Sequence, residues 1–327
     1  MSRLVSAALF ATAALAAALA STHAMAQDGY PSRPIRIVVT FAAGGGPDIM
    51  ARIVAQKLTA NIGQAVVVDN RVGATGIIGA DNAAHSPPDG YTILLGTPAP
   101  LSIAGGSGRK LNYDPLKDFA WVTQGVLLTP IMVVAPNAPY KTVADLIAAA
   151  KAKPGALTYG SAGIGNSQHL AGELFKQMAG IDTLHVPYQG GVFAMAAIVA
   201  GQTDYFFSDP SALPQVRSGK LRALAVSTLK RSAQLPDTPT VSESGLPGYE
   251  YSNWYGFLVP AKTPQPIVQR LFKELTAVLR APDVRERLIA AGMDPAPSSS
   301  PEEMNGFLQK DQEKWARVVK FAKITFD

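Results

Sequence analysis

The chain has 327 residues, contains no cysteine and carries a formal net charge of +5 at pH 7, from 29 basic and 24 acidic side chains. The missing cysteines exclude disulfides, thiolate chemistry and lipid attachment, and the basic residues are scattered, with pairs such as Arg109-Lys110 as the longest runs. Without a basic stripe the sequence does not favour nucleic-acid binding, whereas the modest positive excess suits an anionic small ligand.

The N-terminal segment has the layout of a secretory signal peptide. Arg3 precedes the apolar run LVSAALFATAALAAALA, and the triplet Ala24-Met25-Ala26 offers a cleavage site at its end. An uncleaved membrane anchor is the alternative, but the apolar run is short for a bilayer and rich in alanine. We therefore expect residues 1–26 to be removed and the rest to be a free protein in an exported compartment.

Short apolar, β-branched runs alternate with helical patterns from residue 34 onwards. The run at 34–41 leads through a glycine-rich segment into a helical pattern at 49–63, where Pro47 suits the first helical position and Gly63 the end. Further strand candidates are 65–70, 91–96, 130–136, 156–160, 183–188, 203–208 and 222–227. Further helical patterns are 141–155, 166–180 and 191–201, and in the first of them Thr142 and Asp145 resemble a capping box. This alternation predicts an α/β protein with parallel sheets covered by helices on both faces.

The C-terminal third changes character, with one strand at 252–264 followed by three helical patterns and few new strands. Those helices are expected at 266–281, 282–292 and 300–322. Ser300 and Glu303 mark the start of the last one, and such helices suit a chain that returns to cover an earlier domain. The length after the signal peptide suits two domains. Because no flexible linker separates them, we expect the chain to cross between the domains on ordered strands.

The stretch YGSAGIGNSQHLAGELF at 159–175 is the first candidate for chemistry. A hydrolase nucleophile turn needs G-x-S-x-G, but here a glycine stands directly before Ser161, and His169 lies in the following helix pattern, out of easy reach. A dinucleotide fingerprint fails because Gln168 stands at the third glycine position, and the chain has no P-loop. An exported hydrolase that uses the turn at 160–167 stays an alternative with weak support.

What this stretch does offer is a helix N-terminus after a glycine turn. Its unpaired N–H groups and the positive end of the helix dipole suit a carboxylate. The segment FAAGGGPD at 41–48 repeats the arrangement. One such turn is commonly an ordinary βα connection, but two of them without a catalytic partner favour a binding protein. Asn166 or Ser167 is expected to cap the second helix, and His169 either supports the loop or contacts the ligand.

Other polar and aromatic residues leave alternatives open. The histidines show no metal-ligand spacing, so we expect no metal site. Asp48 and Asp209 either cap helices or accept a bond from a ligand, and Tyr188 at a strand end has the same ambiguity. Trp254 is expected in the core.

Collinear segments along nearly all of the chain after residue 26 resemble the substrate-binding proteins of tripartite tricarboxylate transporters, the Bug receptors. The segments are FAAGGGPDIMAR, VVVDNRVGATGIIGA, PPDGYTILLG, YDPLKDF, DLIAAAKAKPGALTYGSAGIGNSQHLAGELF, HVPYQGG, GKLRALAVST, LPDTPTVSESGLPGYE and WYGFLVPAKTP. So many matches in order make the resemblance far more specific than any single glycine loop.

The resemblance implies a periplasmic receptor with a type II-like flytrap fold, in which each of two lobes is a mostly parallel sheet flanked by helices. Lobe 1 is expected at 27–126 plus 250–327, and lobe 2 at 127–249. The ligand is expected between the lobes, held largely by backbone N–H groups, hydroxyls and waters, without a cofactor and without catalysis. The implied ligand-binding residues are Phe41, Ala42, Gly45, Gly46, Asp48, Thr97, Ser161, Ala162, Gly163, Asn166, His169, Tyr188 and Asp209.

The sequence departs from the family pattern at three positions. Pro47 replaces a residue that commonly supplies a hydroxyl and an N–H, while Phe193 and Ala197 stand where a proline and an acid are frequent. The lost acid and the added ring suggest a larger or less polar ligand, such as an aromatic acid, unless Phe193 simply packs in the core.

The function predicted by these features is capture of a small organic anion, in particular a carboxylate, and its delivery to the permease subunits of a membrane transporter. We expect a monomer that binds no nucleic acid. The alternatives are the exported hydrolase and an envelope interaction protein without a small ligand, and neither has positive support in the sequence.

Overall fold

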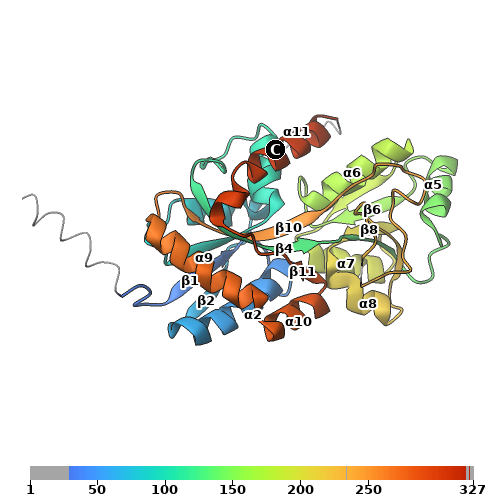
Figure 1. Cartoon of the computed structure of the whole chain (residues 1–327). Coiled ribbons are helices and arrows are strands. Elements are labelled where there is room, and N and C mark those ends of the chain that lie inside the picture. The colour runs from blue at the N-terminus through green and yellow to red at the C-terminus, as the bar shows by residue number, and fades with distance from the viewer. Residues whose placement is uncertain (1–28, 233, 322–323, 325–327) are drawn as a thin grey trace, which may run out of the picture.

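The chain folds around two β-sheets that lie in separate halves of the molecule (Figure 1). The computed structural model describes residues 29–232, 234–321 and 324, so the expected signal peptide at 1–26 lies outside the described residues. No helix in this described part of the chain is both long and apolar enough to cross a membrane. The two-sheet α/β architecture confirms the predicted fold class.

The first sheet has six strands in the order β11-β4-β10-β3-β1-β2. Its strands are β1 (Ile35–Val39), β2 (Val66–Asn70), β3 (Thr92–Gly96), β4 (Phe119–Leu128), β10 (Asn253–Pro260) and β11 (Met293–Pro295). β1 pairs in parallel with β2 and β3, whereas β10 pairs antiparallel with β3 and β4.

The second sheet has five strands in the order β7-β6-β8-β5-β9. Its strands are β5 (Ile131–Val134), β6 (Thr158–Ser161), β7 (Leu184–Pro187), β8 (Tyr205–Ser208) and β9 (Arg222–Val226). β6 is parallel to β7 and β8, while β5 is antiparallel to β8 and β9. Both sheets are therefore mixed rather than mostly parallel, because the strand that arrives from the other half runs against its neighbours.

Helices cover both faces of each sheet. Those packed on the first sheet are α2 (Gly46–Ile62), α3 (Ile77–Ala84), α9 (Gln265–Arg280) and α10 (Pro282–Ala290). Those packed on the second are α5 (Val143–Ala152), α6 (Ser167–Ala179), α7 (Gly191–Val199) and α8 (Leu213–Arg217). Short helical turns are η1 (Ala74–Gly76), η2 (Ala99–Ile103), α4 (Ala104–Gly106), η3 (Pro210–Ala212) and η4 (Pro301–Met304), and the last helix is α11 (Phe307–Phe321).

The predicted helices form where the sequence pattern places them, apart from the last one. The pattern missed helices α3 and α8 and strands β4 and β11. In α9, Val268, Leu271 and Leu275 recur at helical spacing and are buried against the first sheet, each stabilising the fold by roughly 1.5–3 kcal/mol. The predicted capping box of Thr142 and Asp145 at α5 is confirmed. The single helix expected at 300–322 is instead η4 and α11, because Gly306 takes a φ of +75° between them, which ends a right-handed helix.

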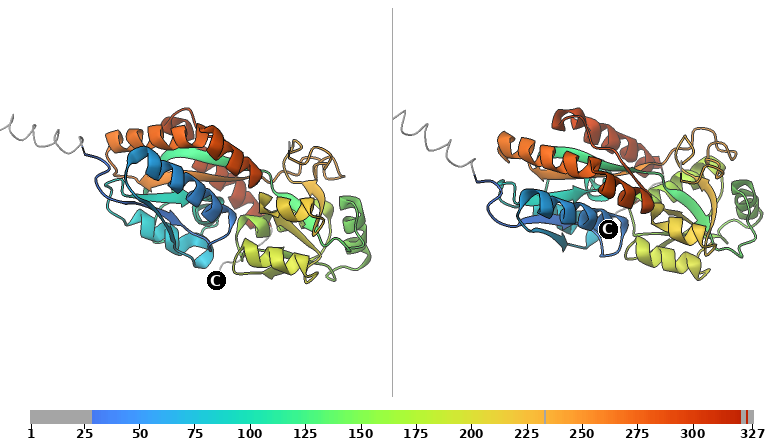
Figure 2. Two further views of the ribbon diagram at one scale, coloured as in Figure 1. Left: turned by 90° about the horizontal axis from the view of Figure 1, so that it is seen from below. Right: turned by 60° about the horizontal axis from the view of Figure 1, so that its bottom comes forward.

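The chain passes between the halves at two places, residues 129–130 between β4 and β5 and residues 251–252 before β10. Figure 2 shows the halves side by side from two further directions. The buried hydroxyl of Ser227 joins these segments, since it donates to the carbonyls of Pro130 (3.1 Å) and Tyr251 (2.7 Å). α11 adds a second connection, because Trp315 packs against Tyr251 and belongs to the core of the second sheet. α11 thus contacts both halves, since Leu308 near its start belongs to a core cluster of the first-sheet half.

Candidate functional site

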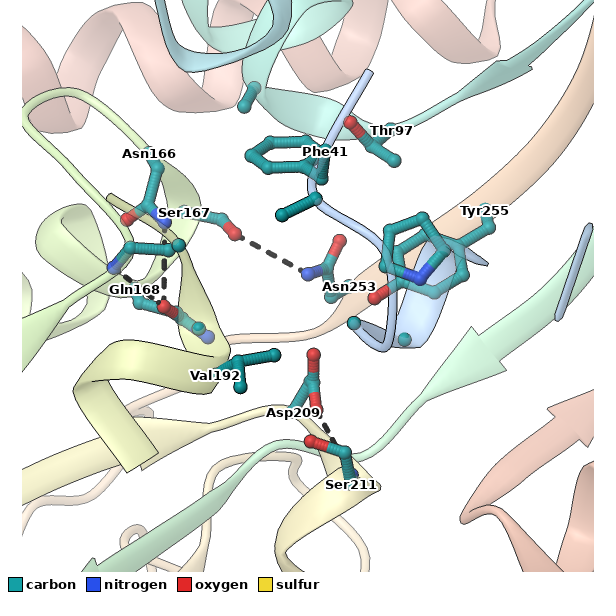
Figure 3. Close-up of a pocket in the computed structure, with 18 of the residues that line it drawn as sticks. Phe41, Thr97, Asn166, Ser167, Gln168, Val192, Asp209, Ser211, Asn253 and Tyr255 are labelled. Carbon is teal, nitrogen blue, oxygen red and sulfur yellow. Dashed lines mark hydrogen bonds between the residues drawn. The ribbon is translucent and has the colours of Figure 1, made fainter. Parts of the chain in front are cut away.

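A pocket opens where the two halves face each other (Figure 3). The first-sheet half supplies the loop before α2, the end of β3 and two side chains of β10. The second-sheet half supplies the turn before α6, the start of α7 and the end of β8. The lining residues are Phe41, Ala42, Gly45, Gly46, Pro47, Thr97, Pro98, Ala99, Ala162, Asn166, Ser167, Gln168, Gly190, Gly191, Val192, Phe193, Asp209, Ser211, Asn253 and Tyr255.

The first glycine turn, residues 41–48, presents the N-terminus of α2 to the pocket. Gly45 is the extended N-cap residue and no side chain caps this helix end, so the N–H groups of the first turn are open to a ligand, except at Pro47, which has none. Gly46 lies close against the opposite wall, since a Cβ there would stand 2.8 Å from the Tyr255 hydroxyl and 3.1 Å from Asp209 Oδ2. Only glycine fits this close approach.

Asp48 holds this turn from behind and does not line the pocket. Its carboxylate accepts bonds from the Gly44 N–H (2.9 Å), Arg52 Nε (2.9 Å) and Asn70 Nδ2 (3.0 Å). Burial disfavours the charged form, but these donors together with the Arg52 charge outweigh it and hold the pKa of Asp48 below its usual value. Asp48 is therefore an ionised support of the loop.

The second glycine turn, residues 160–169, is held by its own side chains. Asn166 caps α6 by accepting the His169 N–H (2.9 Å), and Gln168 Oε1 accepts the Ala162 N–H (2.9 Å). His169 Nδ1 accepts the Gly165 N–H at 3.0 Å. Gly163 and Gly165 take φ values of +131° and +74°, so the turn needs glycine at both positions.

Behind the second glycine turn, a pair of stacked histidines supports Ser161. The rings of His169 and His185 lie 3.8 Å apart between centroids, and His185 Nε2 lies 2.6 Å from Ser161 Oγ. Burial lowers the pKa of His169 to about 4 and, with the neighbouring His169, the pKa of His185 to about 3, so both rings are neutral near pH 7. Ser161 is fully buried, its hydroxyl also bonds to the backbone of Gly163, and it does not line the pocket.

Two polar groups of the pocket have unusual surroundings. Thr97 is 3% exposed, and its hydroxyl has no hydrogen-bond partner among the described residues. Asp209 Oδ1 accepts the Ser211 N–H at 2.9 Å, and the Tyr255 hydroxyl bonds to the same carboxylate, yet burial raises the pKa of Asp209. Among the residues that the structure describes, no Lys, Arg or His lines this pocket, so neither a ligand anion nor Asp209 meets a cationic side chain from this part of the chain there.

The structure brings most of the predicted binding residues together. Those that line the pocket are Phe41, Ala42, Gly45, Gly46, Thr97, Ala162, Asn166 and Asp209. Gly163 and Tyr188 line an adjoining hollow that shares Phe41 and Ala162 with the pocket. Asp48, Ser161 and His169 lie behind the wall with their polar atoms engaged by the protein, so the structure gives these three supporting contacts rather than a place on the pocket surface.

Several residues that line the pocket were not predicted from the sequence. Asn253 and Tyr255 come from β10, far along the chain, where the sequence pattern of a buried strand does not indicate a binding residue. The Asn253 Nδ2 group donates to Ser167 Oγ (3.3 Å) and so connects the two halves. Of the three departures from the family pattern, Pro47 and Phe193 line the pocket, and Phe193 is 54% exposed rather than packed in the core. Ala197 is buried on α7 away from the pocket surface.

Comparison with known proteins adds the evolutionary context of this pocket. Residues 50–324 match the model of the tripartite tricarboxylate transporter family receptor. An uncharacterised protein encoded in the tcbD-tcbE intergenic region of Pseudomonas sp. (strain P51) is 38% identical over 94% of this chain and 91% of its own length. Protein BugT of Bordetella pertussis is 34% identical over 95% of this chain and 94% of its own length.

Solved structures share the whole architecture. The R. palustris protein Rpa4515, solved with adipate, superposes with a TM-score of 0.86 at 35% identity and covers 90% of this chain and 99% of its own. MatC from Rhodopseudomonas palustris, with bound malate, gives a TM-score of 0.83 at 31% identity over 89% of this chain and 100% of its own. These similarities cover both halves and therefore the pocket between them.

Proposed function

Since this chain belongs to the tripartite tricarboxylate transporter receptor family, whose members are periplasmic solute-binding proteins, we propose that its pocket binds a small organic acid through the carboxylate. The observation that carries the proposal is that two helix N-termini, those of α2 and α6, face each other across one pocket in which the described lining residues include no cationic side chain. First-turn N–H groups and the helix dipoles attract an anion there without a salt bridge.

The unpartnered Thr97 hydroxyl supports the same assignment. A buried hydroxyl without a partner is costly, so its presence at a pocket wall indicates a ligand that completes its hydrogen bonding. The adipate and malate of two related structures are both carboxylates, which agrees with the anion that the helix ends favour.

The wider role follows the family. We infer that residues 1–26 are a signal peptide removed after Ala26, that 27–126 plus 250–327 form lobe 1 and 127–249 form lobe 2, and that the protein acts as a monomer. Closure of the lobes about the 129–130 and 251–252 crossings would bury the ligand, and the closed receptor would deliver it to the permease subunits of a tripartite transporter. Catalysis has no place in this proposal, because the serine of the second glycine turn is buried.

The test is a thermal-shift screen of the purified protein, unfolded and refolded to remove retained ligand, against mono-, di- and tricarboxylates, aromatic acids and amino acids. Ligand at 100 times its Kd should stabilise the protein by about 2.7 kcal/mol. Thr97→Val should then weaken binding by roughly tenfold, since it removes one hydrogen bond to a charged group.

The matched control is Thr203→Val. Thr203 is also 3% exposed and also has an unpartnered hydroxyl, but it lies outside the pocket, so its replacement should leave the affinity unchanged. Absence of a shift with every acid, or equal loss of affinity in both variants, would contradict the proposed site.

A further inference from the structure

The turn at residues 73–76, which contains η1 between β2 and α3, has a strained backbone. Its four residues, Gly73, Ala74, Thr75 and Gly76, take φ values of +130°, +46°, +55° and +93° in succession. Glycine adopts such angles readily, but for a β-branched residue such as threonine they are an outlier. Among the residues that the structure describes, only Ala74 and Thr75 combine a Cβ with a positive φ. Strain of this kind persists only where surrounding structure holds it and clusters at functional sites, so the contacts of Thr75 indicate what the turn does.

Thr75 connects the two halves directly. Its hydroxyl donates to the Ile164 carbonyl at 3.1 Å, and Ile164 belongs to the second glycine turn in the opposite half. The two turns are in contact at this point, since a Cβ added at Gly163 would stand 3.5 Å from Thr75 Oγ1. The strained residue of one half therefore holds the turn that forms the pocket wall in the other half.

The bond lies beside the adjoining hollow and outside the β10 crossing. Thr75 and Gly163 both line this hollow, which shares Phe41 and Ala162 with the pocket. Residues of β10, which follow the 251–252 crossing, line the pocket but not the hollow. A rotation of one half about the crossings changes the separation of the two turns, so the bond forms only when the halves are together.

Both partners of this bond are held in place before it forms. In the second glycine turn, the Gly165 N–H donates to His169 Nδ1 at 3.0 Å, and the Ser161 hydroxyl bonds to the backbone of Gly163. In the first half, the β-branched side chain of Thr75 has few rotamers. Because little freedom is lost when two ordered groups meet, most of the free energy of the bond is available to hold the halves together.

We propose that Thr75 is a positioning residue that latches the halves: its hydroxyl holds the second glycine turn at Ile164 in the closed receptor and so slows the release of a bound acid. The left-handed backbone directs the hydroxyl to Ile164, which explains why a strained threonine is kept there. The proposal rests on the proposed function, because the latch acts on halves that close around a ligand, and it deepens that function by naming what holds the closed state.

Three substitutions at one position test the latch. Thr75→Val keeps the shape and removes the donor, so it should weaken binding by about threefold to tenfold, mainly through faster dissociation. Thr75→Ser keeps the hydroxyl and should keep the wild-type rate. Thr75→Gly relieves the backbone and removes the hydroxyl, so dissociation should be as fast as in Thr75→Val while the free energy of unfolding does not fall. The rates are measured by stopped flow on the refolded protein, with adipate, malate and benzoate as probes.

A second readout needs no ligand. Since the chain contains no cysteine, Lys273→Cys on α9 and Gln177→Cys on α6 place two spin labels at exposed positions in opposite halves. Distances between the labels are measured by pulsed electron paramagnetic resonance, without acid and with each probe. Thr75→Val should gain a population in which the halves are further apart, and Thr75→Ser should match the wild type.

The matched control removes a hydroxyl-to-carbonyl bond within one half. Thr276 donates to the Phe272 carbonyl inside α9 at 2.7 Å, so Thr276→Val should leave the dissociation rates and the label distances unchanged. Equal rates and equal distances in the wild type and Thr75→Val overturn the latch and leave the proposed function standing. No binding of any acid in the wider screen overturns the proposed function, and the label distances without acid then decide the latch by themselves.

Discussion

The two glycine turns look alike in sequence, yet they are built differently. The first turn (41–48) has no side-chain cap, and an ionised carboxylate, Asp48, holds it from behind. The second turn (160–169) is capped by Asn166 and held by neutral groups, the amide of Gln168 and the imidazole of His169. The first turn therefore relies on charge, and the second on a buried network of neutral hydrogen bonds.

This difference shows how one anion site can be shared by two lobes without a cationic side chain. The first turn offers open backbone donors and glycine surfaces that allow close approach. The second turn keeps polar side chains at the pocket wall whose geometry is fixed by their bonds to the protein. Variants that remove the Asp48 carboxylate, or the neutral hydrogen bonds of the second turn, can therefore show how much each turn adds to folding stability and to ligand binding.

The largest expected difference between the two turns is in how their contribution to folding stability changes at acid pH. His169 and His185 have pKa values lowered to about 4 and about 3 by burial, so between these values and about 6.5 the unfolded chain binds more protons than the folded one. This difference destabilises the folded protein as the pH falls below about 6.5, by on the order of 3 kcal/mol for each ring at pH 4. Asp48, whose pKa is lowered in the folded protein, stabilises the fold above about pH 3.9, and this stabilisation is lost only as the pH falls below that value.

Urea unfolding at pH 7 and pH 4.5 measures this effect. The double variant His169→Gln, His185→Gln should lose less stability between the two pH values than the wild type, while Asp48→Asn should lose as much as the wild type. If all three proteins lose the same free energy of unfolding between pH 7 and pH 4.5, the histidine pair does not control the loss of stability in acid.

Removal of the Asp48 carboxylate should have the next largest effect. Asp48→Ala leaves the Gly44 N–H without its acceptor and leaves the Asn70 amide with the Phe41 carbonyl as its acceptor. We expect a loss of about 2 kcal/mol in the free energy of unfolding at pH 7. Lys117→Ala is the control, because its ion pair with Asp114 is exposed and should contribute far less to the free energy of unfolding. Equal losses in the two variants would argue against a special role of Asp48.

A methyl group at the tip of the first turn should affect binding more than folding. At Gly46 a Cβ would press on the buried Tyr255 hydroxyl at 2.8 Å, whereas at Gly45 the nearest atom, the Ala42 carbonyl oxygen, is 3.4 Å away. Gly46→Ala should therefore weaken ligand binding by roughly tenfold, or about 1.4 kcal/mol, and Gly45→Ala by clearly less. Calorimetry with the ligand found in the screen measures the affinity of both variants, and equal affinities would contradict the close approach at Gly46.

The smallest effect is expected at the cap of the second turn. Asn166→Ala removes the acceptor of the His169 N–H and should cost about 1 kcal/mol of stability. Asn166→Asp keeps the cap and should keep the stability, but it adds a negative charge to the pocket wall and should weaken binding of an acid. If the aspartate variant binds the acid as well as the wild type, the carboxylate does not lie near this turn.

The sequence by itself determined the local structure of this protein. Alternating apolar runs predicted the strands and helices, and the capping residues at α5 and α6 follow from side chains that bond to backbone only three positions away. The glycines of the second turn were recognisable because positive φ angles favour glycine whatever the rest of the fold does. The helix N-termini, and thus the preference for an anion, were also local features.

Tertiary structure decided which of these features meet. His185 lies 24 positions from Ser161 along the chain, and Tyr255 and Asn253 reach the pocket only because β10 crosses from one half to the other. Whether Asp48, Ser161 and His169 face a ligand or support a loop depends on distant partners such as Asn70 and His185, which no local pattern specifies. Hydrogen bonding and packing beyond a few residues depend on strand order and lobe placement, so the specificity of the pocket, unlike its anion preference, became visible only in three dimensions.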